Sequence, residues 1–153
     1  MPDLLVKLYD LPSERPSLPD GVTMRPVMAA EVSMVRDWIE ENFSRGWADE
    51  FLKGAYAETT SSIIAMQDRK VIGFVCYDVS AIGMFGPTGV DKSQRGRGLG
   101  AALLFAALDA MIAKGHVYAT IGWVGPIEFY EKLVGATLIE GSEKRYSGKL
   151  IQS

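Results

Sequence analysis

The chain has 153 residues, a length that favours a single domain able to bury about two thirds of its unfolded surface. Hydrophobic residues make up 48% of it and charged residues 23%, as in an ordinary globular protein. The formal net charge of -3 gives no basic surface for nucleic acid, and no run approaches the ~20 apolar residues of a membrane-spanning helix. The single cysteine, Cys76, excludes a disulfide within the chain and suits a reducing compartment. We therefore expect a cytoplasmic protein that binds neither nucleic acid nor a membrane.

Residues 1–20 are predicted to form an N-terminal arm and linker. Residues 4–9 favour a short strand, whereas Pro12, Pro16 and Pro19 make the following stretch an extended linker. We expect the arm to lie outside the main fold, either along a sheet edge, on the partner subunit of a homodimer, or as a mobile tail. Residues 21–153 are predicted to form one domain.

The domain should begin with a strand at residues 22–27 and two amphipathic helices. Residues 31–43 place one apolar stripe on a helix, made of Val32, Val35, Trp38, Ile39 and Phe43. The second helix carries an apolar stripe that begins at Trp47. Residues 42–46 connect the two helices.

Three strands are predicted next. Residues 61–66 and 71–77 should pair as a hairpin, because residues 67–70 have the composition and length of a tight turn. Residues 81–90 should form the third strand, in which glycines and Pro87 point to a bulge that interrupts the ladder of hydrogen bonds. Cys76 is expected to be a small core residue.

A glycine-rich loop at residues 90–100 joins this strand to a helix over residues 101–113. It contains three glycines and two arginines, Gly96, Gly98, Gly100, Arg95 and Arg97. Glycines let backbone N–H groups crowd around an anion, and the helix directs the positive end of its dipole to the same place. The arginine side chains add a planar, charged fork that suits phosphate. The loop is therefore a candidate pyrophosphate-binding site.

Three phosphate-binding loops could account for this segment. A P-loop needs Gly-Lys-Ser/Thr after its second glycine, which is absent here. Gly96, Gly98 and Ala101 fit the dinucleotide fingerprint, but that motif requires an acidic residue about 20 positions on, and residues 118–123 contain none. The third alternative is a resemblance: the RGRGLG segment from Arg95 is similar to the Arg/Gln-x-x-Gly-x-Gly/Ala motif of GCN5-related N-acetyltransferases (GNAT), whose loop binds the pyrophosphate of coenzyme A.

A second motif supports this resemblance. The FYEKL segment from Phe129, ahead of Gly135, resembles the aromatic-Tyr-Glu-Lys-Leu-Gly signature on the last main helix of the family. Here that helix should open at Gly125-Pro126, where a proline loses no hydrogen bond.

The remaining elements are predicted from pattern. Residues 117–123 favour a strand, and His116 at its start is expected to be structural or exposed. Residues 136–140 and 145–151 favour a closing antiparallel pair around residues 141–143.

The order of elements and the resemblance together imply a mixed α/β fold of the GNAT type, with a mostly antiparallel central sheet flanked by helices. Strands 81–90 and 117–123 are expected to run parallel and splay apart. That V-shaped opening would hold the pantetheine arm of the cofactor.

The resemblance implies acetyl-CoA as co-substrate and no metal. It places pantetheine on the backbone of the bulged strand and the pyrophosphate on the loop. The implied cofactor-binding residues are Thr88, Gly89, Val90, Arg95, Gly96, Arg97, Gly98, Leu99, Gly100 and Ala101. The implied reaction is direct transfer of an acetyl group to an amine of a small molecule or peptide, with Tyr130 as the general acid that protonates the departing thiolate. The alternative is a non-catalytic acyl-CoA-binding regulatory module.

Departures from the family pattern leave the general base open. Trp123 stands where many members have an asparagine, Val134 is an extra residue before Gly135, and residues 81–90 contain no acid. The nearest candidates for the base are Asp78, Glu50 and Glu128. The alternative is a relay of water molecules that carries the proton to solvent.

The acceptor site has weaker signals. In the family the connector at residues 42–46 borders the acceptor, although Phe43, Arg45, Trp47 and Glu50 suit packing or surface positions equally. Six acidic residues fall near the expected acceptor mouth: Glu40, Glu41, Asp49, Glu50, Glu140 and Glu143. That balance predicts a cationic amine as acceptor.

Overall fold

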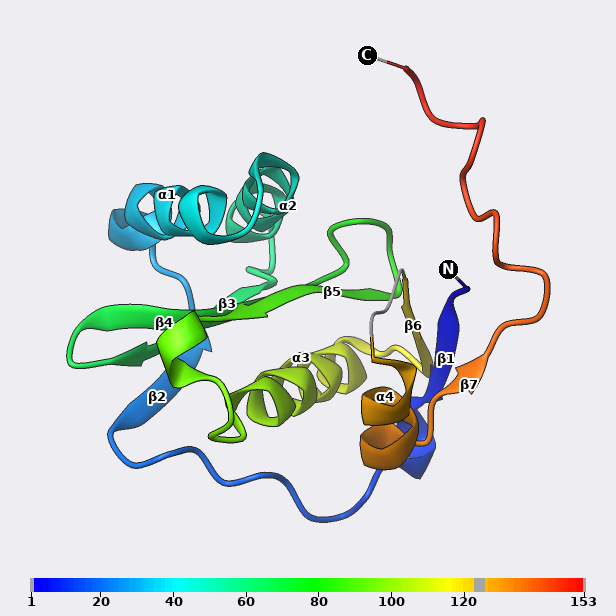
Figure 1. The fold of residues 1–153 in the computed structure, drawn as a ribbon, viewed down its shortest axis with the longest axis horizontal. Coiled ribbons are helices and arrows are strands. Elements are labelled where there is room, and N and C mark those ends of the chain that lie inside the picture. The colour runs from blue at the N-terminus through cyan, green and yellow to red at the C-terminus, as the bar shows by residue number, and fades with distance from the viewer. Residues whose placement is uncertain (1, 123–125, 153) are drawn as a thin grey trace.

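The computed structural model describes residues 2–122 and 126–152 and forms a seven-stranded mixed sheet with helices on both faces (Figure 1). The strand order is β2-β3-β4-β5-β6-β1-β7, with β5 and β6 parallel and the other neighbours antiparallel. The strands are β1 (Leu4–Lys7), β2 (Val22–Pro26), β3 (Ser62–Gln67), β4 (Lys70–Tyr77), β5 (Met84–Val90), β6 (Tyr118–Ile121) and β7 (Thr137–Leu138). The helices are α1 (Val32–Asn42), α2 (Arg45–Ala55), α3 (Leu99–Lys114) and α4 (Ile127–Val134). The predicted mixed α/β fold is confirmed.

The hairpin of β3 and β4 forms where the sequence predicts it. Asp68 and Arg69 at its tip have positive φ angles of 52° and 62°. Two successive residues of this kind make the tight turn whose twist matches that of the flanking strands. Gln67 pairs with Lys70 directly across the turn, so the expected turn at residues 67–70 is confirmed.

Alternate residues of β4 enter two separate cores, one on each face of the sheet. Phe74 and Cys76 pack in the core under α1 and α2, beside the fully buried Phe51. Val75 and Tyr77 pack in the core under α3. Burial raises the pKa of the Cys76 thiol to about 12, so this cysteine is an unreactive core residue, as predicted.

Helix α3 packs along one face of the sheet and begins and ends at glycines. Gly98 and Gly115 cap it with left-handed φ angles of 81° and 104°, which favour glycine. It is buried along much of its length, which explains its apolar sequence. No helix in the described part of the chain is long and apolar enough to cross a membrane.

The linker that follows β1 is held on α3 by an ion pair. Arg15 donates two hydrogen bonds to the carboxylate of Asp109, from Nε at 2.9 Å and from Nη2 at 2.8 Å. The same guanidinium lies 4.9 Å from the centre of the Phe105 ring. The expected extended linker therefore crosses the outer side of the helix in a defined position.

Strand β1 lies inside the sheet, so the expectation of an arm outside the main fold is wrong for this segment. It pairs with β6 from Leu4↔Ile121 to Lys7↔Tyr118, and with β7 on its other side. Leu4 and Val6 are fully buried. The partners of β1 come from the far end of the chain, which a local pattern cannot reveal.

The C-terminal segment does not form the expected antiparallel pair. β7 has only two residues and pairs with β1, and residues 145–151 run through turns instead of a strand. The backbone of Asp3 provides the reason. Its carbonyl accepts a hydrogen bond from the N–H of Ile139 at 2.9 Å, and its N–H donates to Ser142 Oγ at 2.8 Å. The chain after β7 therefore bonds to the start of β1, and its remaining backbone hydrogen bonds close turns, such as that from the N–H of Arg145 to the carbonyl of Ser142 at 3.1 Å.

The place of β1 in the sheet can be tested with Leu4→Ala. Leu4 is fully buried, so truncation should lower the free energy of unfolding by about 2–5 kcal/mol in urea denaturation. Lys7→Ala changes an exposed position of the same strand and should shift that free energy by less than about 0.5 kcal/mol. Equal stability of the two variants would contradict a buried β1.

Candidate active site

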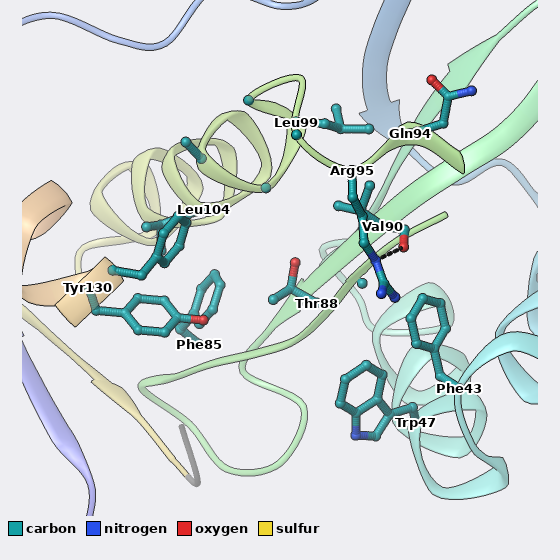
Figure 2. Close-up of a pocket in the computed structure, with 16 residues that line it drawn as sticks. Phe43, Trp47, Phe85, Thr88, Val90, Gln94, Arg95, Leu99, Leu104 and Tyr130 are labelled. Carbon is teal, nitrogen blue, oxygen red and sulfur yellow. Dashed lines mark hydrogen bonds between the residues drawn. The ribbon is translucent and has the colours of Figure 1, made fainter. Parts of the chain in front are cut away.

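A cavity of about 550 Å³ opens where β5 and β6 part (Figure 2). The two strands pair at Met84↔Thr120 and Phe85↔Ile121. Beyond this point β5 continues to Val90 beside β4, whereas β6 ends at Ile121. The expected parallel pair is therefore present, and its separation creates the opening.

The predicted cofactor-binding residues gather at this cavity with one exception. Those that line it are Thr88, Gly89, Val90, Arg95, Gly96, Gly98, Leu99, Gly100 and Ala101. Arg97 lies on the outer side of the loop, where its guanidinium donates to the side-chain oxygens of Gln67, at 3.3 Å, and of Gln94. Arg97 therefore stabilises the loop and does not face the cavity.

The glycine loop presents backbone N–H groups to the cavity. Gly96 and Gly98 have left-handed φ angles of 84° and 81°, and no atom lies within 4 Å of the position that a Cβ would take at either. The first hydrogen bond of α3 runs from the N–H of Ala102 to the carbonyl of Gly98, at 3.1 Å. The N–H groups of residues 99–101 precede it and have no partner within the helix, so they can bind an anion.

Arg95 brings positive charge from the loop to the end of β5. Its Nε donates to the carbonyl of Val90 at 3.3 Å (Figure 2). The side chain is exposed and lines the cavity. The bond to Val90 therefore orients the guanidinium of Arg95 beside the N-terminus of α3. The guanidinium and the helix N-terminus both attract a negatively charged group.

An aromatic wall closes the side of the cavity toward α2. Phe43 stacks on Trp47 with 5.3 Å between ring centres and lies edge-on to Phe74 at 5.7 Å. Ser44 caps α2 by accepting a hydrogen bond from the N–H of Trp47 at 3.1 Å, which fixes the start of that helix. Phe43 also covers Gly89, where a Cβ would lie 2.5 Å from its Cζ. Phe43 and Trp47 thus serve packing and line the cavity at the same time.

Tyr130 borders the cavity at the side of α4. Its ring lies edge-on to Phe85 at 6.1 Å and to Phe129 at 5.1 Å, and only 7% of the residue is exposed. Figure 2 shows its hydroxyl pointing into the cavity on the side of Thr88. Burial raises the pKa of the phenol above its usual value, so Tyr130 is protonated at neutral pH and can donate a proton.

The end of α4 accommodates the extra residue before Gly135. Val134 is the buried last residue of the helix, and Gly135 caps it with a φ of 66°. Val134 therefore lies at the end of α4 remote from Pro126. The substitution at Trp123 and the predicted helix start at Gly125 lie outside the described residues.

Four residues that line the cavity were not identified from the sequence: Phe85, Gln94, Leu104 and Phe129. Phe85 and Leu104 lie in apolar stretches that suit a core equally well. They border the cavity only because β5 and β6 separate. The aromatic residue before Tyr130 in the FYEKL segment was the one signal that could have indicated Phe129.

Asp78 does not face the cavity, which removes it as a candidate base. Its carboxylate accepts hydrogen bonds from Lys114 Nζ at 3.0 Å, from the N–H of Gly83 at 2.6 Å and, at 2.8 Å, contacts His116 Nε2. Burial alone would raise the pKa of Asp78, but the hydrogen bonds from His116, Gly83 and Lys114 lower it below its usual value. Asp78 is therefore a structural carboxylate, and His116 is structural as expected.

Glu50 is better placed than the other two acids. Glu128 is exposed on α4 and is not among the residues that line the cavity. Glu50 lies on α2 and borders a second hollow of about 180 Å³ that shares Trp47 and Phe85 with the larger cavity. Ser80 Oγ donates to Glu50 Oε2 at 2.6 Å. A carboxylate therefore borders a hollow that adjoins the cavity.

The other acidic residues expected near the acceptor mouth do not gather around it. Glu40 pairs with Arg36 at 2.6 Å on α1, and Glu143 borders a separate hollow in the C-terminal segment. Across the described ranges, no group of three or more His, Cys, Asp or Glu side chains could hold a metal ion. Among the residues that the structure describes, Glu50 is thus the one acidic residue that lines either of the two cavities at the site, and the expectation of a cationic acceptor rests on it.

Comparison with known proteins gives a family and a fold. Residues 31–136 match the model of the acetyltransferase (GNAT) family. No curated protein gives a significant match. A GCN5-related N-acetyltransferase from Sphaerobacter thermophilus has a TM-score of 0.71 at 18% identity, over 90% of this chain and 48% of its own.

Two further solved structures carry ligands. A GNAT family acetyltransferase from Brucella melitensis, in complex with acetyl-CoA, has a TM-score of 0.59 at 18% identity, over 77% of this chain and 86% of its own. The GNAT protein YhbS from Escherichia coli, in complex with CoA, has a TM-score of 0.51 at 19% identity, over 67% of this chain and 63% of its own. The chain spans between 19% and 53% of the length of four structural relatives, the Sphaerobacter thermophilus protein included.

The contact between Phe43 and Gly89 can be tested with Gly89→Ala. The added Cβ would lie 2.5–3.0 Å from three atoms of the Phe43 ring, which is held by its aromatic neighbours. Thermal and urea denaturation should show a loss of about 1–3 kcal/mol of stability.

Gly100→Ala is the matched control. No atom lies within 4 Å of the new Cβ, and the position is in a helix, so this change should be neutral or stabilise by up to ~1 kcal/mol. Phe43→Leu should restore part of the stability lost in Gly89→Ala. A Gly89→Ala variant as stable as Gly100→Ala would refute the close packing.

Proposed function

Because the chain belongs to the GNAT family of acetyltransferases, we propose that it transfers an acetyl group from acetyl-CoA directly to an amine of a small molecule or peptide. The observation that carries this proposal is a single cavity bordered by both the glycine loop and the Tyr130 phenol. Two solved relatives, one in complex with acetyl-CoA and one in complex with CoA, support the choice of donor.

The residues around the cavity fit such a donor. Unpartnered N–H groups at residues 99–101 and the guanidinium of Arg95 would hold the diphosphate. The space next to Gly96 and Gly98, where no atom lies within 4 Å of a Cβ position, leaves room for it. The part of β5 that has left β6 offers backbone groups to the amide-containing arm, as a neighbouring strand would.

Bound acetyl-CoA supplies a thioester whose acyl carbon an amine can attack. The protein must take a proton from the amine, stabilise negative charge on the acyl oxygen and return a proton to the sulfur. A C–N bond forms and a C–S bond breaks, and each ammonium that is acetylated releases one proton overall. The backbone of β5 at Phe85 and Gly86, which borders the hollow beside the cavity, is the proposed source of N–H donors for the acyl oxygen.

Tyr130 is the proposed acid. Its hydroxyl is directed into the cavity, and burial raises the pKa of the phenol, so it holds its proton until thiolate character develops. Glu50 is the proposed base. It borders the adjoining hollow, and the hydrogen bond from Ser80 at 2.6 Å orients its carboxylate.

The proposed activity is tested by measuring free thiol released from acetyl-CoA over a panel of amines, with mass spectrometry of the acetylated products. Tyr130→Phe removes one hydroxyl from the cavity and should lower the turnover number by ~10²-fold or more, with little change in coenzyme affinity. Tyr56→Phe removes a hydroxyl from an exposed side chain and should have no effect.

Two outcomes would contradict this account. Coenzyme A binding without thiol release for any amine would indicate a non-catalytic acyl-CoA-binding module. A Tyr130→Phe enzyme whose turnover number stays within a factor of two, where chemistry limits the rate, would exclude the phenol as the acid.

The role of the glycine loop is tested with Gly98→Val in calorimetry with coenzyme A. A β-branched side chain at a φ of 81° would distort the loop and misplace the N–H groups of α3. Affinity should fall by ~100-fold or more, because several charge-assisted hydrogen bonds are lost together. Gly148→Val imposes the same change at a φ of 76° in the C-terminal segment and should bind normally. Equal affinity of the two folded variants would exclude the loop as the diphosphate site.

A further inference from the structure

A second hollow adjoins the cavity and shares Trp47 and Phe85 with it. It has a volume of about 180 Å³ and is smaller than the roughly 300–1,000 Å³ of sites for drug-sized ligands. Its polar side chains are Glu50, Ser80 and Arg145, and its apolar ones include Trp47, Met84 and Phe85. We call it the acceptor hollow. It brings one carboxylate and one guanidinium to a small space with apolar walls.

The carboxylate of Glu50 is oriented by a hydrogen bond from Ser80. Ser80 Oγ donates to Oε2 of this carboxylate at 2.6 Å. Ser80 lies in the loop between β4 and β5, so the bond joins α2 to the wall across the hollow. The carboxylate can accept further hydrogen bonds from an ammonium group, because each of its oxygens has two lone pairs.

Arg145 lies across the end of β6. A Cβ at Gly122 would overlap Nη2 of Arg145 and would lie 2.8 Å from its Cζ. The guanidinium therefore covers the backbone of Gly122, at the edge of the opening between β5 and β6. The absence of a side chain at Gly122 permits this position.

Asp3 holds the inner edge of this guanidinium. Its Oδ1 lies 2.6 Å from Nε of Arg145, as an ion pair without hydrogen-bond geometry. The backbone of Asp3 binds Ile139 and Ser142, at 2.9 Å and 2.8 Å, which fixes the turn that carries Arg145. Both terminal nitrogens of the guanidinium can then form a fork toward a carboxylate in the hollow.

We propose that the acceptor hollow binds a free α-amino acid with an apolar side chain, whose amine is the group that is acetylated. Glu50 receives the ammonium, Arg145 binds the carboxylate, and the side chain lies against Trp47, Met84 and Phe85. This inference rests on the proposed acetyl transfer, because Trp47 and Phe85 border both the hollow and the coenzyme cavity.

An α-amino acid carries an ammonium group and a carboxylate group on the same carbon atom, so it offers one charge to Glu50 and the opposite charge to Arg145. A simple alkylamine would satisfy Glu50 and leave the guanidinium of Arg145 without its partner. A peptide amide would place an uncharged group there. Ligands with a carboxylate should therefore bind more tightly than otherwise equal ligands without one. The ratio of the two affinities should be about tenfold to a hundredfold, as expected for one charge-assisted pair.

The test is calorimetric titration of the wild-type protein saturated with coenzyme A, which prevents turnover. L-leucine, L-methionine and L-alanine are each compared with their carboxamides. We expect each amino acid to bind about tenfold or more tightly than its amide. Arg145→Gln should remove this ratio, and Arg145→Lys should retain part of it. Arg69→Gln makes the same substitution at the β3–β4 turn and should keep the full ratio.

Equal binding of acid and amide by the wild-type protein, or an unchanged ratio in a folded Arg145→Gln variant, would overturn the proposal. If alkylamines are acetylated and amino acids neither bind nor react, the acceptor class is wrong while acetyl transfer stands. If amino acids bind with the expected ratio and no thiol is released, the hollow is assigned correctly and acetyl transfer fails.

Discussion

The candidate site depends on one constraint: β5 is bonded to β4 along most of its length but to β6 only at its start. The ladder with β6 ends at Phe85↔Ile121, whereas the ladder with β4 reaches Gly73↔Val90. Past Phe85 one edge of a buried strand has no neighbouring strand, and backbone groups there need other partners. The glycine loop follows directly from the end of the same strand. The direct consequence is a cavity with unpaired backbone of β5 at one side and the N-terminus of α3 at another.

The neighbouring elements hold the two strands in this arrangement from both faces. Phe43 presses on Gly89 from the side of α2, and Tyr130 packs against Phe85 from the side of α4. At the start of β5, Gly83 donates to the carboxylate of Asp78 and accepts a hydrogen bond from the N–H of Thr120 at 2.9 Å. Hydrogen bonds lower the pKa of Asp78, so the contribution of this carboxylate to stability is present at neutral pH and is lost only as the pH falls through that lowered value. Asp78, one of the three acids that the sequence offers as the general base, thus stabilises the register of β5 against β6.

The sequence predicts the parts of this structure that depend on neighbours along the chain. The turn at residues 67–70, the helix predicted over residues 101–113 and the glycine loop all have local causes in turn residues, caps and apolar spacing. The sequence predicts a strand at residues 4–9 but outside the main fold, and it predicts a strand at residues 145–151 that does not form. In both cases the true bonding partners are distant in sequence. The same limit applies to the site. The loop glycines could be named from spacing, but the position of Arg145 follows from Asp3 at the other end of the chain and could not.

The central claim is that a coenzyme binds between β5 and β6 with its diphosphate on the start of α3. The most direct measurement is amide NMR during titration of the protein with coenzyme A. The account predicts the largest shifts at the amides of residues 95–101 and 88–90, with no change at Ser33 and Asp37 on the exposed side of α1. Shifts that are absent at residues 95–101, or that are largest on a face remote from the opening between β5 and β6, would contradict it.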